Sequence, residues 1–181
     1  MREMHALHLS LSQMLTSAVD LTDILRAEVV LAVSAFDFFV HEITRLGMLE
    51  CHAGVRAPPD AFKKFQIPME SAQTLTPANF DAIIRTKHGY LSFQHPDKVA
   101  EAIRLYSPIE LWNSISLVVS MPAKAIKTDL TLIIDRRNKI AHEADTDPSY
   151  PGQRWPITRG QVEHIFDFLE QIARGIYKAT T

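Results

Sequence analysis

Three residues that could do chemistry together lie within six positions of one another in the C-terminal third of the chain. Arg137, Asn138 and His142 occur in the segment LTLIIDRRNKIAHEAD, which runs from Leu130 to Asp145. An imidazole can move a proton near neutral pH, and a guanidinium offers phosphate oxygens a planar fork of hydrogen-bond donors. Arg137, His142 and Asn138 are therefore the candidate catalytic residues.

The segment around these residues has the periodicity of an amphipathic helix. At about 100° per residue its apolar positions gather on one stripe, and Arg137 lies inside that stripe between Ile133 and Ile140. The polar positions form a second stripe beside it, made of Asp135, Asn138, His142 and Asp145. The spacing thus aims a permanently charged side chain at a packed surface, next to a stripe that carries an imidazole.

A guanidinium in an apolar stripe needs an acidic partner. The longest helical pattern of the sequence runs from Asp20 to about Leu49 and carries Asp37 on its polar side. We predict that Asp37 forms a supporting ion pair with Arg137, with Asp20 and Glu42 as the alternative partners.

Basic residues are concentrated in the same region of an otherwise slightly acidic chain. The net charge is −2 and the pI is near 6.4, so any contact with a polyanion must come from a local patch. Between Lys124 and Lys139 there are five basic residues and two acidic ones. A solvated helix face is the ordinary explanation, whereas RNA binding would make Arg136 and Lys139 substrate-binding residues.

The residue inventory favours phosphodiester chemistry on RNA without a metal or other cofactor. Glycine-rich phosphate loops, paired cysteines and a His-Glu-x-x-His motif are all missing from the sequence. The 2′-hydroxyl of RNA can act as an internal nucleophile, so the enzyme must supply only proton transfer and charge stabilisation. Because one imidazole cannot comfortably be both base and acid, a homodimer that brings two copies of His142 together is expected.

Length and composition predict one domain that spans residues 1–181. The 181 residues are 46% hydrophobic, which is enough for a sizeable core. Cys51 is the single cysteine, which excludes an internal disulfide and indicates a reducing compartment. No apolar run approaches the length of a membrane span, so we expect a cytoplasmic protein with no membrane contact.

The fold class expected is all-α, a helical bundle with three long helices and several short ones. The long helices are predicted over residues 20–49, from Pro122 to a stop at Asp147-Pro148, and from a capping box at Thr158 to the C-terminus. A second capping box is predicted at Ser107–Glu110. Aromatic residues in the loop of residues 148–156 could either stack on bases or hold the loop to the core.

Two strings in the sequence resemble those of HEPN domains. RRNKIAHEAD, which begins at Arg136, contains an arginine, a polar residue directly after it and a histidine after four intervening positions. Together with RAEVVLAVSAFDFFVHEI, which begins at Arg26, it is similar to the RiboL-PSP-HEPN clade. The similarity extends through the Leu111-Trp112 region and the C-terminal helix.

The resemblance implies a HEPN-like helical bundle that is usually a dimer and, in many members, a metal-independent endoribonuclease. It places the family's arginine, polar residue and histidine on Arg137, Asn138 and His142. It also implies a toxin–antitoxin, restriction or phage-defence setting, with an antitoxin or other defence-system protein as a possible partner. The alternative is a non-catalytic helical dimerisation or RNA-binding module, in which Arg137 is structural and His142 is idle.

Overall fold

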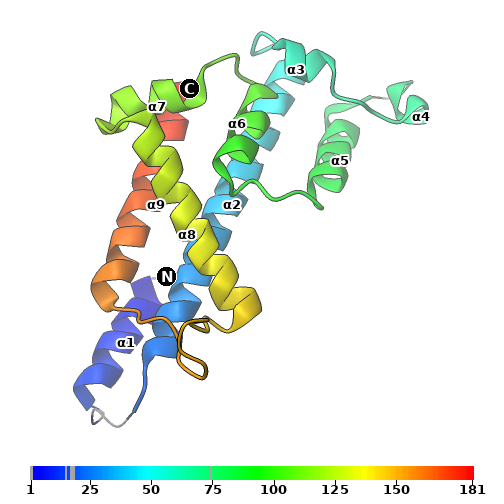
Figure 1. The fold of residues 1–181 in the computed structure, drawn as a ribbon. Helices are drawn as coiled ribbons and strands as arrows, with labels where there is room; N and C mark the ends of the chain where they lie inside the picture. The colour runs from blue at the N-terminus through cyan, green and yellow to red at the C-terminus, as the bar shows by residue number, and fades with distance from the viewer. Residues whose placement is uncertain (1, 15, 17–18, 74) are drawn as a thin grey trace.

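The computed structural model describes residues 2–14, 16, 19–73 and 75–181, with all their side chains except those of Arg2 and His5. These residues form helices and no strand, as the sequence predicts (Figure 1). The helices are α1 (Arg2–Met14), α2 (Thr22–His52), α3 (Asp60–Lys63), α4 (Met69–Ala72), α5 (Pro77–His88), α6 (Pro96–Arg104), α7 (Leu111–Val119), α8 (Ala123–Glu143) and α9 (Arg159–Thr180).

The three long helices α2, α8 and α9 build the centre of the fold, and α7 packs against both α8 and α9 (Figure 1). In α8 the buried residues recur at helical spacing and therefore share one face: Ile126, Leu130, Ile133 and Ile134. Gly47 of α2 allows a close approach, because a Cβ at this position would lie 2.2 Å from Cδ2 of the buried Tyr106. The buried face of α8 runs from Ile126 to Ile134, and no residue of the helix after Ile134 is fully buried.

The helix starts follow the predicted capping signals at one site and depart from them at another. Thr158 and Gln161 form the expected capping box, with the Gln161 N–H donating to Thr158 Oγ1 and the Thr158 N–H donating to Gln161 Oε1. The capping box predicted at Ser107–Glu110 is wrong. Ser107 is buried and its N–H closes the end of α6 on Ile103 O, so α7 begins only after Glu110.

The end of α8 also differs from the prediction, which placed the helix stop at Asp147-Pro148. The helix ends at Glu143, because Ala144 and Asp145 adopt left-handed backbone conformations with φ of 50° and 59°. The Asp145 N–H donates to Lys139 O at 2.9 Å and closes this last turn. Asp145 therefore does not continue the polar stripe that contains His142.

The reversed backbone carries the Asp145 carboxylate into the interior, where two guanidinium groups share it. Asp145 Oδ2 accepts from Arg26 Nε and from Arg136 Nη2, each at 2.8 Å, and the Asp145 side chain is fully buried. The Trp155 carbonyl accepts from Arg26 Nη2 at 2.9 Å, and the Trp155 N–H donates to Asp145 O. One buried anion therefore joins α2, the end of α8 and the segment that leads to α9.

Replacing Asp145 with Asn should strongly destabilise the fold, because two largely desolvated guanidinium groups would lose their counter-ion. We expect the free energy of unfolding to fall by about 3–5 kcal/mol in urea denaturation. The matched control is Glu170→Gln, which removes an exposed partner of Arg174 and should cost less than about 1 kcal/mol. Equal losses in the two variants would contradict a structural role for the buried anion.

Candidate active site

The last two turns of α8 carry all three candidate catalytic residues. Asn138 and His142 are four positions apart, so their side chains are neighbours on the helix surface, about 6 Å apart along the axis. Arg137 lies about 100° around the helix from Asn138. His142 is exposed, whereas Arg137 and Asn138 are half-buried.

Arg137 points along the same side of α8 as the buried core residues, but it lies where the core no longer covers that side. Ile133, one turn earlier, is buried, whereas Ala141, one turn later, is exposed. Arg137 Nε is itself buried and has no hydrogen-bond partner among the described residues. Beyond Arg137 one edge of the apolar stripe of α8, at Ala141, is therefore exposed, whereas its other edge, at Ile140, still packs against the core.

The ion pair predicted between Asp37 and Arg137 is not formed in the described part of the chain. Asp37 instead accepts from the Phe93 N–H at 2.7 Å and from Gln94 Nε2 at 2.9 Å. It also lies 3.7 Å from Nε2 of His41, whose ring is stacked on Phe93. Asp37 therefore orders the loop between α5 and α6.

The alternative partners of Arg137 are occupied elsewhere too. Asp20 accepts from the Thr22 N–H at 2.8 Å, at the start of α2. Glu42 forms an ion pair with Arg45 at 2.8 Å, and this hydrogen bond lowers the pKa of the Glu42 carboxyl. Neither of these acids is an ion-pair partner of Arg137 in the described structure.

This lack of a partner separates Arg137 from the other arginines. Of the arginines whose side chains are described, all form an ion pair except Arg104 and Arg137. Arg104 is exposed to solvent, so a lone charge there is inexpensive, whereas Arg137 is half-buried. Arg137 is thus a partly desolvated cation for which the described chain supplies no anion.

Arg136, the immediate neighbour, has the opposite environment. Its Nη2 donates to Asp145 and to the carbonyls of Trp155 and Pro156, at 2.8, 3.3 and 3.1 Å. Burial lowers the pKa of Arg136, and the Asp145 carboxylate opposes that shift. The guanidinium expected to bind substrate is therefore largely engaged within the protein.

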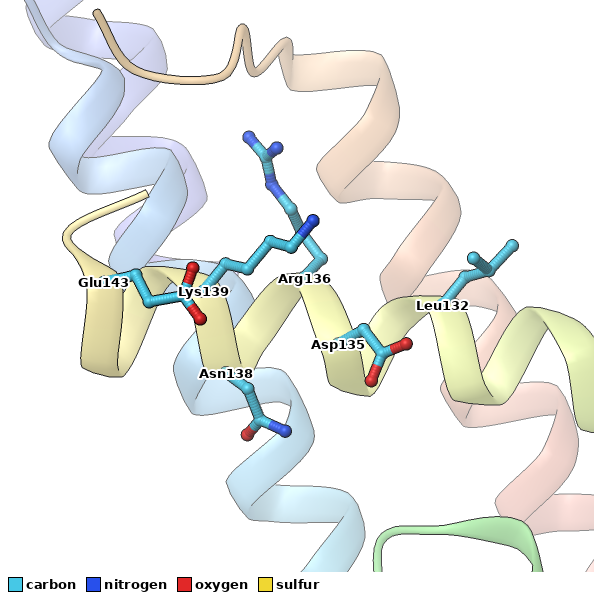
Figure 2. A pocket seen from close by; sticks show the side chains of 6 residues that line it. All are labelled: Leu132, Asp135, Arg136, Asn138, Lys139 and Glu143. Carbon is cyan, nitrogen blue, oxygen red and sulfur yellow. The ribbon is translucent and has the colours of Figure 1, made fainter. Parts of the chain in front are cut away.

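Lys139, the second expected substrate-binding residue, is exposed, and its Nζ lies 5.4 Å from the centroid of the Trp155 ring. Lys139, Arg136 and Asn138 line a surface groove of about 350 Å³, together with Leu132, Asp135 and Glu143. Figure 2 shows Arg136 and Lys139 extending toward the segment that precedes α9, and Asn138 extending to the other side of the helix. The groove does not include His142 in its lining.

The loop of residues 148–156 is held to the bundle by its C-terminal end. Trp155 is half-buried beneath Lys139, and Arg154 forms an ion pair with Asp23 of α2. Tyr150 at the other end is exposed. Trp155 therefore attaches the loop to the bundle, through its ring against Lys139 of α8 and its backbone hydrogen bonds with Asp145 and Arg26.

A family model described as RiboL-PSP-HEPN matches residues 1–181, which is the whole chain. No curated protein and no solved structure shows significant similarity to this chain. None of the helices in the described ranges combines the length and the hydropathy that crossing a bilayer requires.

Because Arg137 has no ion-pair partner among the residues that the structure describes, Arg137→Ala should cost little stability. We expect the free energy of unfolding to change by about 1 kcal/mol or less, from lost packing of the side-chain stem. The matched arginine control is Arg26→Ala, which should lose several kcal/mol because it breaks the buried pair with Asp145. A loss for Arg137→Ala as large as that for Arg26→Ala would indicate a structural partner for Arg137.

Proposed function

The chain belongs to the RiboL-PSP-HEPN family. Because this family assignment is compatible with a nuclease role, we propose that the protein is an endoribonuclease. One observation carries the proposal. The side chains of Arg137, Asn138 and His142 have no hydrogen-bond or ion-pair partner among the described residues, although most other arginines are paired. Polar groups left free at one end of a well-ordered helix are available to a substrate.

The proposed reaction begins with attack of a ribose 2′-hydroxyl oxygen on the adjacent phosphorus. An imidazole of His142 takes the 2′-hydroxyl proton as the O–P bond forms, and an imidazolium donates a proton to the departing 5′-oxygen as the P–O5′ bond breaks. The Arg137 guanidinium stabilises the charge on the non-bridging oxygens, and Asn138 orients the imidazole or the phosphate. The products are a 2′,3′-cyclic phosphate and a 5′-hydroxyl, with no metal or other cofactor in the proposed reaction.

A second copy of the chain would supply the second imidazole. Two features support such a homodimer. The apolar stripe of α8 is uncovered at Ala141, and α2 exposes a row of apolar side chains on the side away from the core. This row, the α2 apolar face, consists of Ala27, Leu31, Ala35 and Phe38. A two-fold contact would bury such a face and could bring two copies of Arg137 and His142 into one cleft.

Lys139 is proposed to guide the RNA backbone into the site. Arg136 is proposed to assist with the guanidinium hydrogen-bond donors that Asp145 does not occupy. The proposed setting is a toxin–antitoxin, restriction or phage-defence system in the cytoplasm, in which an antitoxin or other defence protein would restrain the nuclease. The same unpaired groups would be the natural target of such a partner, because covering them blocks the site.

RNA cleavage in the presence of a chelator tests the chemistry. His142→Ala and Arg137→Ala should each reduce the cleavage rate by about 100-fold or more, because they remove proton transfer and charge stabilisation. The matched control His164→Ala removes an exposed histidine of α9 and should retain activity. Product analysis should find 2′,3′-cyclic phosphate termini, and a 2′-deoxy nucleotide before the scissile bond should stop the reaction.

Full activity of His142→Ala, or cleavage of the 2′-deoxy substrate, would contradict the proposed mechanism. RNA binding that persists without any cleavage by the wild-type protein would instead assign the chain to the second class, a non-catalytic RNA-binding module.

The dimer is tested through the α2 apolar face. Phe38 is 67% exposed, so Phe38→Asp should leave the protomer folded while placing a charge in the proposed contact. We expect the dimer fraction in sedimentation velocity to fall and RNA cleavage to fall in parallel. Tyr90→Asp, at an exposed site after α5, is the matched control and should change neither. A Phe38→Asp protein that remains dimeric would exclude this face as the interface.

A further inference from the structure

A second groove, which the proposed reaction does not use, is lined by residues of α6, α7 and the first turns of α8. Its volume is about 350 Å³, and its lining includes three basic residues, Arg104, Lys124 and Lys127. All three are exposed, and none of them forms an ion pair with a described residue. The acids in the lining are Asp97 and Glu110.

Two helices begin at this groove. Neither Glu110 at the start of α7 nor Pro122 at the start of α8 makes a side-chain capping hydrogen bond, and first-turn residues of both helices line the groove. Unpaired N–H groups and the positive ends of two helix dipoles favour an anion. Trp112 is also part of the lining, but its indole nitrogen is buried and is not exposed to a ligand in the groove. The groove therefore combines three unpaired cations and two carboxylates with the uncapped first turns of two helices.

The basic groove lies on the same side of α8 as Asn138 and His142, whereas Arg137 lies on the core side of the helix. Lys124, Lys127, Asn138 and His142 fall within roughly a sixth of a turn of one another at 100° per residue, with the acidic Asp135 at the edge of this stripe. Lys127 and His142 are separated by about 22 Å along the helix axis. At the ~3.4 Å axial spacing of a stacked strand, this separation corresponds to about six nucleotides.

We propose that the groove formed by Arg104, Lys124 and Lys127 binds backbone phosphates of the RNA strand about six nucleotides from the bond that is cleaved near His142. The inference rests on the proposed function and adds a second contact point for the same substrate. A strand held at both ends of one face of α8 is fixed in register, so the groove would make the protein prefer longer single-stranded RNA.

Binding of fluorescently labelled single-stranded RNA to His142→Ala protein, which should not cut it, tests the inference by anisotropy. With an oligonucleotide of about 16 nucleotides, Lys124→Gln/Lys127→Gln should weaken binding roughly tenfold and reduce the slope of log K against log salt by about 1.4. With one of about four nucleotides the loss should be no more than about twofold, because it cannot span both sites. Lys64→Gln/Lys178→Gln removes the same charge from two other exposed sites and should leave both affinities within about twofold.

Matched thermal melting of the variants confirms folding. If wild-type protein cleaves RNA but the groove variant binds both lengths as tightly as the control, the groove is excluded and the proposed function stands. If His142→Ala protein binds no RNA and wild-type protein cleaves none, both are overturned. Capture of an acidic poly-glutamate peptide in the groove, without any loss of RNA affinity in the groove variant, would assign the site to a protein partner and also overturn the inference.

Discussion

A single buried carboxylate determines how the end of the molecule that carries the candidate catalytic residues is built. A desolvated anion is tolerated only when cations and hydrogen-bond donors surround it. Asp145 meets this requirement with Arg26 from α2 and Arg136 from α8, while the Trp155 backbone joins from the segment before α9. Three parts of the chain that are distant in sequence must therefore meet at one point, and that point is the C-terminal end of α8.

Two consecutive arginines on α8 have opposite environments, and only one of them has a structural partner among the described residues. Residues next to each other on a helix differ in direction by about 100°, so Arg136 turns inward to Asp145 while Arg137 turns to the uncovered end of the apolar stripe. The first is satisfied within the protomer and the second is not. The ion pair of Arg136 with Asp145 holds the helix backbone from which Arg137, Asn138 and His142 project. Arg136 therefore helps to position Arg137.

Local signals in the sequence were sufficient for the long helices and for the capping box at Thr158, because helical periodicity and capping depend on near neighbours. They also placed the three candidate catalytic residues on one helix. These local signals failed where contacts with residues distant in the sequence determine the local structure. The turn at Asp145 depends on Arg26, which is 119 positions away, and Asp37 is occupied by the backbone of Phe93. Ser107 carries a capping signal, but burial and the end of α6 take it away from α7.

The separation between Asp145 and Arg137 has a consequence for how this fold can diverge. The residues that hold the end of α8 through ion pairs, Arg26, Arg136 and Asp145, are distinct from the candidate catalytic residues, so loss of the latter is expected to leave the bundle folded. In the proposed mechanism, a duplicated copy that lost Arg137 or His142 by one substitution would therefore be a folded but inactive paralogue, still able to form the proposed dimer with an active copy. One substitution at either position would then remove activity at little cost in conformational stability.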